Sequence, residues 1–268
     1  MACLGAVLLL LALAGCGGGD DDDSGPTNTL ILTPDLAELP AGANAATTLD
    51  EIVDILRGRA AALDIEATIG LRDDDRISVE ASGTTAEEAA EIFTRTALLT
   101  IVQPALGPVG QVLCQAADGT QVSVPRENVS YPPAGSPDRG TPRCVVGDGT
   151  FAELTWVPAV AVLSGQETEL TGEFVDQATL DTTQGSIVIV SFSQGGSLLL
   201  TSISEELIGL PMGIFLDGEL VGAPTVSERI ITGNVAIAGL SESRGRIVAA
   251  QLNSGALPIP VSAEAGGS

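Results

Sequence analysis

The order of strand-like and helix-like segments between residues 29 and 102 constrains the fold of this chain more than any other feature. Two segments with apolar residues at helical spacing, which begin at Thr48 and Thr85, alternate with short apolar runs. The runs that predict strands are residues 29–33, 67–71, 76–81 and 97–102. The resulting order, β-α-β-β-α-β, is the split βαβ pattern of a ferredoxin-like sheet, so we expect an α+β fold.

Both predicted helices begin at a sequence typical of a capping box, in which a threonine and a glutamate three residues later satisfy each other's backbone N–H groups. The pairs are Thr48 with Glu51, and Thr85 with Glu88. Between the second and third strands lies Asp73-Asp74-Asp75. These carboxylates could form a calcium loop, but their spacing is not that of an EF-hand, and we interpret them as a solvated hairpin tip.

The chemistry of the chain is limited by its composition. Aromatic residues make up 3% of the sequence, so the core must be aliphatic. The formal net charge of −24 disfavours nucleic acid and anionic lipid head groups as partners, because both are recognised by basic patches. Histidine is absent, which removes the commonest general base and the commonest zinc ligand. We therefore expect no catalytic residue, no metal, no cofactor and no enzymatic activity.

The N-terminus predicts export. Residues 4–14 form an apolar run that is too short for a bilayer, which takes roughly 20 residues, but that suits the core of a signal peptide. It ends in Leu13-Ala14-Gly15-Cys16, which resembles the cleavage site of a bacterial lipoprotein. We expect lipidation of Cys16 and localisation at the cell membrane, lipid-anchored on the extracytoplasmic face. The alternative is an ordinary signal peptide with a chance cysteine. No Lys or Arg precedes the run, so the true start codon could lie upstream.

Two cysteines remain after the signal peptide and the lipidated residue are set aside. They are Cys114 and Cys144, which lie in a segment rich in glycine and proline at residues 107–150. An extracytoplasmic compartment is oxidising, so we expect a disulfide between them. Such a bridge contributes roughly 3 kcal/mol on the chain-entropy model. We predict that it pins a long loop.

The second half of the chain has its own local signals. Residues 186–192 and 234–240 predict strands, and residues 197–208 and 244–252 predict helices. Asp217-Gly218 is a strong signal for a two-residue hairpin turn. Gly255 is expected to end the second helix with a positive φ. Leu257-Pro258-Ile259-Pro260-Val261 is expected to be extended and to lie at a sheet edge.

Several motifs, taken in order, resemble those of the SecD family of protein-export translocase subunits. Residues 56–63 are similar to its "LRxRxxxLG" helix, with Asp64 where glycine is usual, and residues 75–80 match its "DRIxVE" strand. The segments at 170–172, 214–224, 230–237 and 252–260 resemble its "LTG", "LDG…AP", "IxxGxxxI" and "LxxGALPxP" stretches. The motif residues, for which we expect mainly structural roles, are Arg57, Arg59, Leu216, Asp217, Gly218, Pro224, Gly233, Gly255, Ala256, Leu257 and Pro258.

The resemblance implies the first extracytoplasmic domain of that family. In such a domain, a ferredoxin-like base is formed by N- and C-terminal segments, and an α+β head, inserted between them, swings on a hinge and engages emerging polypeptide. The implied division is a signal peptide at 1–16, a flexible acidic and glycine-rich linker at 17–28, the first part of the base at 29–106, the disulfide-pinned loop at 107–150, a connecting strand at 151–164, the head at 165–240, a base return helix and strand at 241–262, and a tail at 263–268.

The sequence leaves two hypotheses for function. The family's transmembrane helices do not follow before Ser268, so we expect no proton-driven movement. The first hypothesis is a lipid-anchored binding module for secreted polypeptides or translocase subunits, which touches the membrane through its lipid only and binds no nucleic acid. The alternative is a stand-alone surface lipoprotein that binds a ligand or protein and reuses the fold without a role in export. In that case the segment at 107–150 could carry the binding surface.

Overall fold

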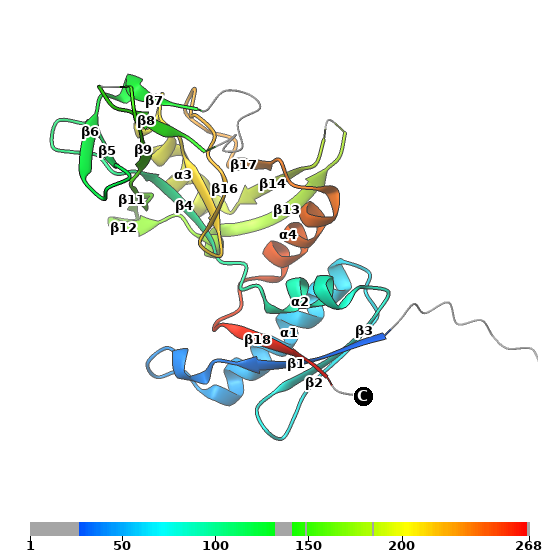
Figure 1. Ribbon diagram of the computed structural model, residues 1–268. Coiled ribbons are helices and arrows are strands. Elements are labelled where there is room, and N and C mark those ends of the chain that lie inside the picture. Colours follow the sequence, from blue (N-terminus) through cyan, green and yellow to red (C-terminus); the bar gives the residue numbers. More distant parts are fainter. Residues whose placement is uncertain (1–26, 132–140, 148, 184, 267–268) are drawn as a thin grey trace, which may run out of the picture.

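A computed structural model describes residues 27–131, 141–147, 149–183 and 185–266. The predicted signal peptide, Cys16 and nearly all of the predicted linker lie outside these residues. The described part has an α+β fold, with a base and a larger head that joins a small separate sheet (Figure 1). Within it, no helix combines the length and the apolar character needed to cross a bilayer.

The base is a ferredoxin-like sheet with two helices. Its strands pair in the order β18-β1-β3-β2, and each pairing is antiparallel. Helices α1 and α2 pack against this sheet. The elements are β1 (Thr27–Pro34), α1 (Ala45–Ala62), β2 (Ala67–Leu71), β3 (Ile77–Ser82), α2 (Ala86–Thr94) and β18 (Val261–Ala265). The base is therefore built from N- and C-terminal segments, as predicted.

One strand was assigned to the wrong sheet. The predicted strand at 97–102 exists as β4 (Leu99–Pro104), but it belongs to the head, and β18 takes the fourth place in the base. The reason lies in the preceding residues, where Ala97 adopts a φ of 61° and the chain turns away from the base. An apolar run predicts a strand but carries no information about the sheet in which it pairs.

The two predicted capping boxes differ in outcome. In α2, Glu88 N donates to Thr85 Oγ1 over 3.2 Å, and Thr85 N donates to Glu88 Oε2 over 3.3 Å, so that box is confirmed. The box at Thr48 is wrong. Helix α1 begins earlier, with Asn44 as its N-cap, and Thr48 is buried inside the helix. Asparagine is the stronger N-cap, which explains the earlier start.

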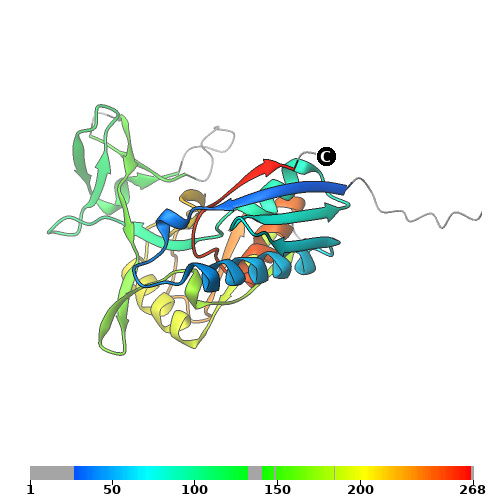
Figure 2. The ribbon, with the colours of Figure 1, turned by 90° about the horizontal axis from the view of Figure 1, so that it is seen from below.

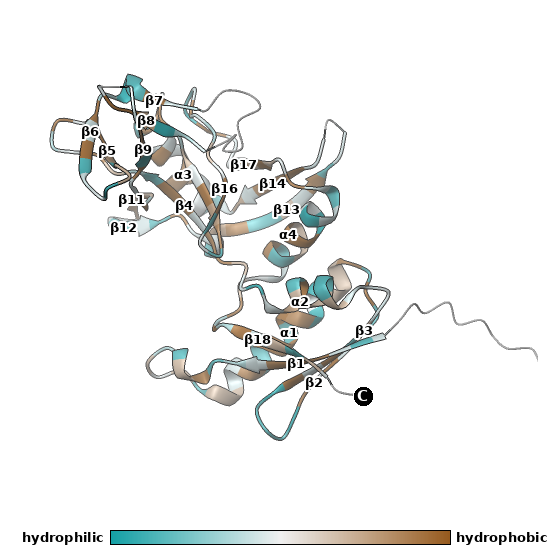
Figure 3. Ribbon diagram, viewed as in Figure 1, coloured by the Kyte–Doolittle hydropathy of each residue, from teal (hydrophilic) through white to brown (hydrophobic). Residues whose placement is uncertain are grey.

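The aspartate cluster between β2 and β3 forms a hydrophilic hairpin tip (Figure 3). Arg76 Nε donates to Asp74 Oδ2 over 2.8 Å, and the ion pair lowers the pKa of Asp74 and raises that of Arg76. Among the described residues, no group of three potential metal ligands is found. The three aspartates are exposed between β2 and β3, so the segment forms the solvated hairpin tip that we predicted.

The head contains three sheets and two helices. The sheets have the orders β10-β4-β15-β16, β13-β14-β17 and β11-β12. Helix α3 begins three residues before the predicted range, and Gly255 ends α4 with a φ of 90°, as expected. The further elements are β10 (Trp156–Pro158), β11 (Val160–Leu163), β12 (Gln166–Glu169), β13 (Val175–Asp181), β14 (Ile187–Phe192), α3 (Gln194–Glu206), β15 (Gly213–Leu216), β16 (Glu219–Gly222), β17 (Asn234–Ala238) and α4 (Glu242–Ser254).

The segment at 107–150 is not the loop that we predicted. With the residues just after it, it forms a five-stranded sheet of order β6-β5-β9-β8-β7, which projects away from the base (Figure 2). Cys114 and Cys144 form the expected disulfide with a Cα–Cα distance of 6.4 Å, and both are fully buried. The strands are β5 (Val112–Gln115), β6 (Gln121–Val124), β7 (Val129–Ser130), β8 (Arg143–Val145) and β9 (Phe151–Leu154). The bridge links two strands of one sheet, β5 and β8, rather than pinning a loop.

Candidate functional site

The base and the head are joined where the chain crosses between them twice. Residues 95–98 lead from α2 into β4, and residues 255–260 lead from α4 back to β18. Leu257 N donates to Thr96 O over 2.8 Å, so the two connections lie side by side. Each contains a residue with positive φ, Ala97 at 61° and Gly255 at 90°. We call these two connections the junction.

Arg59 of α1 is the centre of the junction. Its side chain is completely buried, which is rare for arginine outside an ion pair. The guanidinium donates to four backbone carbonyls. These are Ile92 O at 3.0 Å, Arg95 O at 2.6 Å, Thr96 O at 3.3 Å and Gly255 O at 3.3 Å. One side chain of the base therefore holds the end of α2 and both connections.

Asp217 links the head to the same point. It begins the hairpin turn between β15 and β16 with a φ of 52°. Its Oδ1 accepts from Thr96 Oγ1 and from Leu98 N at 2.9 Å, and its own N–H donates to Leu98 O at 3.0 Å. Burial lowers the pKa of Arg59 to about 10, and the negative charge of Asp217 acts in the opposite direction. Arg59 thus stays protonated at neutral pH.

Helix α4 forms the rest of the contact between the two parts. Gln251 is fully buried, and its Nε2 donates to Glu91 O at 2.9 Å and to Ile92 O at 3.4 Å. Arg244 forms an ion pair with Glu91 on the same side. Ile247 packs into the apolar core of the base, whereas its neighbour Val248 packs into that of the head. The helix is therefore shared by both cores.

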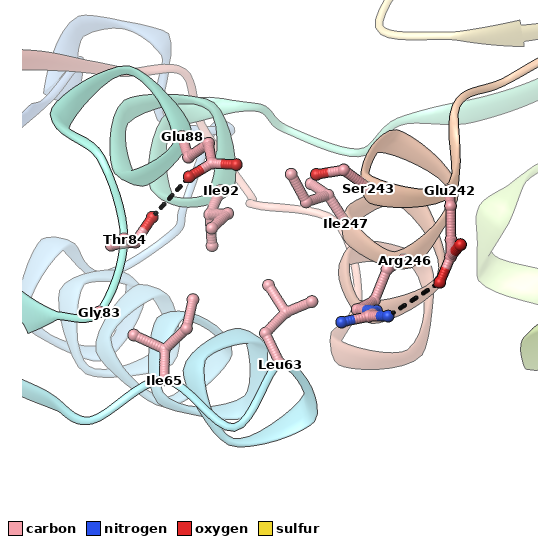
Figure 4. A pocket seen from close by; sticks show the side chains of 10 residues that line it. All are labelled: Leu63, Ile65, Gly83, Thr84, Glu88, Ile92, Glu242, Ser243, Arg246 and Ile247. Atoms are coloured by element: carbon pink, nitrogen blue, oxygen red, sulfur yellow. Dashed lines mark hydrogen bonds and ion pairs between the residues drawn. The ribbon is translucent and has the colours of Figure 1, made fainter. Parts of the chain in front are cut away.

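A pocket of about 430 Å³ opens beside this contact (Figure 4). Its walls come from the end of α1, the start of α2 and the start of α4. Glu242 and Arg246 lie on the α4 side, 3.2 Å apart in an ion pair. The apolar side chains that line it are Leu63, Ile65, Ile92 and Ile247. Any shift of α4 against the base would change the size of this pocket.

The structure brings only some of the motif residues together. Arg59, Asp217, Gly218, Gly255 and Leu257 meet at or next to the junction. Ala256 and Pro258 lie within its second connection, whereas the motif residues outside the junction are Arg57, Leu216, Pro224 and Gly233. Of these, Arg57 is exposed and donates to Ile69 O at 3.0 Å, and Gly233 packs against Ser197 with a φ of 71°.

Sequence reasoning missed two members of the junction, Thr96 and Gln251. Thr96 contributes both a hydroxyl and a carbonyl, and Gln251, like Arg244, is a polar residue of α4 that faces the base. Neither belongs to a recognisable motif, because a single threonine or glutamine carries no sequence signal of burial. In the part of the chain that the structure describes, the junction offers hydrogen bonds and packing.

Replacing Asp217 by alanine is expected to lower the free energy of unfolding by about 2 kcal/mol. The change removes the oxygen that accepts from Thr96 Oγ1 and Leu98 N. Alanine would also have to adopt the φ of 52°, which it tolerates less well than aspartate does. Urea unfolding of the full chain measures the loss. Asp217→Asn keeps an acceptor and the tolerance for positive φ, and should lose less than half as much. Equal losses would contradict this role.

Comparisons with known proteins agree with the fold. Residues 152–259 match the family model described as SecDF, P1 head subdomain. This match includes α4, whereas the predicted boundaries end the head at residue 240 and place α4 in the base at 241–262. The predicted head limits of 165–240 stay a prediction.

Relatives are similar along most of the chain. The protein translocase subunit SecD of Dehalococcoides mccartyi is 28% identical over 231 residues, which are 81% of this chain and 43% of that protein. The same subunit of Rhodobacter capsulatus is 27% identical over 252 residues, which are 92% of this chain and 40% of that protein. The chain thus spans less than half the length of these relatives.

Two solved structures share the fold. One, described as "Structure and function of a membrane component SecDF that enhances protein export", has a TM-score of 0.58 at 20% identity, and the match covers 90% of this chain and 99% of that chain. SecDF in its super-membrane-facing form also has a TM-score of 0.58, at 22% identity, over 88% of this chain and 29% of that one.

Proposed function

We propose that this chain, which carries a P1 domain of the SecD family, takes part in protein translocation by binding exported polypeptides at the extracytoplasmic face of the membrane. The observation that carries the proposal is that similarity to SecD runs through both parts of the fold, base and head. The motif residues that gather at the junction support the same reading, since they join those two parts. The proposed partners are secreted polypeptides or translocase subunits.

The surface of the head supports the binding of unfolded chains. Leu198 on α3 is 56% exposed and Ile231 is 71% exposed. The loop that carries Ile231 lies along α3, because Thr201 Oγ1 donates to Ile230 O at 2.9 Å. Unfolded polypeptides expose apolar side chains of many kinds, and exposed apolar residues on a folded domain can bind them without a defined sequence.

A lipid on Cys16 would hold the domain at the membrane. The first described residue is Thr27, the start of the base sheet, and a flexible linker of the intervening length spans about 20 Å on average. This would keep the base close to the outer face of the bilayer. Mass spectrometry of the mature N-terminal peptide tests the anchor. A diacylglyceryl group on Cys16 is expected, whereas an unmodified cysteine or cleavage elsewhere would reject it.

Site-specific photo-crosslinking tests the proposed function. A photoreactive residue in place of Leu198 is expected to capture a secretory precursor that has been arrested during translocation, because this side chain is exposed on the head. The matched control is Asp54, which is exposed on α1 of the base. A third position, Phe151, is 56% exposed on the inserted sheet.

The three positions separate the two hypotheses for function. Capture of the precursor or of a translocase subunit from Leu198 alone supports a role in export. The competing hypothesis is a stand-alone surface lipoprotein that binds a ligand or protein without a role in export, and the disulfide-bonded sheet that projects from the fold supports it. It predicts capture of a different protein from Phe151 and none from Leu198. If Leu198 captures neither precursor nor translocase, the export role is rejected.

A further inference from the structure

The outer edge of β17 has an open row of backbone groups. Phe192 N donates to Gly233 O at 2.9 Å, and the antiparallel register with β14 then pairs Val235 and Ile237 in the same way. The alternate residues Asn234, Ala236 and Ala238 must therefore direct their N–H and C=O groups away from β14. In the described part of the chain, no hydrogen bond partner reaches these groups.

Three other sheet edges of this protein carry a residue that blocks part of the edge. At β13, Asn253 takes both backbone groups of Ala178, through Oδ1 at 2.7 Å and Nδ2 at 2.8 Å. At β2, Arg57 donates to the outward carbonyl of Ile69. At β10, Pro158 has no N–H to offer. Natural proteins block such edges because a free edge pairs with other chains.

A hollow lies along that edge. Its volume is about 510 Å³, and Ala236 and Ala238 line one side of it. Leu220 and Gly222 of β16 line it from the neighbouring sheet. Tyr131 also lines it, with its hydroxyl donating to Ala223 O. The side chains of Ala236 and Ala238 are exposed but small, so another backbone can approach them closely.

The composition of the edge also favours pairing with many sequences. Strand β17 reads Asn-Val-Ala-Ile-Ala, without a charge or a proline, although the chain as a whole has a net charge of −24. Backbone hydrogen bonds are the same for every residue type, so an edge of this kind gives affinity without sequence specificity. An extended polypeptide segment has the chemistry that fits.

We propose that an extended segment of a client polypeptide adds to β17 as a further strand, pairing with the outward groups of Ala236 and Ala238 in this hollow. The inference rests on the proposed function and names the place and manner of binding. The hydrogen bonds hold the client backbone, and the hollow accommodates the client side chains that face the head. The apolar surface at Leu198 and Ile231 would contribute separately.

Ala236→Pro tests this pairing in the full chain. Proline removes one outward N–H and leaves the hydrogen bonds to β14, so the strand should still form. The probe is a short fluorescein-labelled peptide of alternating valine and threonine. The variant is expected to bind the peptide about tenfold more weakly, because it loses one well-placed hydrogen bond and because the proline ring blocks the approach of the peptide. Ala236→Thr keeps the N–H and is the matched control, with binding close to that of the unchanged protein.

A second measurement uses the unchanged protein and modified peptides. A peptide N-methylated on one edge can still pair through its other edge, whereas a peptide methylated on both edges cannot. We expect the first to bind and the second to lose binding. If Ala236→Pro and the doubly methylated peptide both bind as well as their controls, strand addition at β17 is overturned. The proposed function would not be affected by that result, because cross-linking from Leu198 tests it independently.

Discussion

Replacing Arg59 by methionine is expected to lower the free energy of unfolding by about 3–5 kcal/mol, among the largest effects of any single substitution in the base. Methionine fills much of the same space but donates no hydrogen bond. The carbonyls of Ile92, Arg95, Thr96 and Gly255 would lose charge-assisted donors inside a buried site. Urea denaturation followed by circular dichroism measures the change.

The chain supplies a matched control for this substitution two positions away. Arg57 lies on the same helix but is exposed, and it donates to Asp54 and to Ile69 O. Arg57→Met is expected to cost less than about 1 kcal/mol, because exposed ion pairs contribute little. Arg59→Lys should be nearly as damaging as Arg59→Met, since one ammonium cannot reach four carbonyls. Similar losses for Arg57→Met and Arg59→Met would contradict the central role of Arg59.

The second large effect concerns the inserted sheet. The double variant Cys114→Ala and Cys144→Ala is expected to lose about 3–4 kcal/mol, from the loop-closure entropy of the 30-residue separation. The strands of this sheet are two to four residues long, too short to be stable without such a constraint. Hydrogen exchange should report the loss first at the amides of β5 and β8.

Reduction provides the control for this prediction. A reducing agent should destabilise the unchanged protein to the same extent and have no further effect on the double variant. Both cysteines are fully buried and belong to the apolar core that continues into the head. Loss of the bridge should therefore also weaken, to a lesser degree, the packing beside it. Unchanged exchange rates at β5 in the double variant would reject the stapling role.

The parts of the fold that follow from short-range chemistry could be predicted. The capping box at Thr85 and Glu88, the turn at Asp217-Gly218 and the positive φ of Gly255 each depend on a few neighbouring residues. The order of such elements predicted a ferredoxin-like base with three of its four strands correct, because the fourth strand is β18 and not the run at 97–102. The resemblance to SecD supplied the insertion of the head.

Features that depend on distant partners could not be predicted. The run at 97–102 was recognised as a strand, but its partners β15 and β10 lie far along the sequence. The sheet at 107–150 has strands too short to show periodicity, and its glycines and prolines are typical of loops. Strand β13 was missed because its sequence, Val-Asp-Gln-Ala-Thr-Leu-Asp, is half polar.

Some residues of the junction were predictable, but its geometry was not. Arg59 and Asp217 were identified as motif residues with structural roles, yet nothing in the sequence distinguishes the buried Arg59 from the exposed Arg57. An arginine on a helix is usually solvated, so its burial among four carbonyls depends on where α2 and the second connection end. The meeting of these four carbonyls around one guanidinium depends on the tertiary structure and not on the local sequence.

The pairing of β1 with β18 has a consequence for how the molecule is made. Synthesis and export both deliver a chain from its N-terminus, so Leu30 emerges long before Ala265, the residue that it faces. The base sheet lacks one of its strands until nearly all of the chain has passed. Closing so long a loop is entropically costly and slows folding. The architecture therefore delays the completion of the base. The export that we propose would require an unfolded chain, and this delay would favour it.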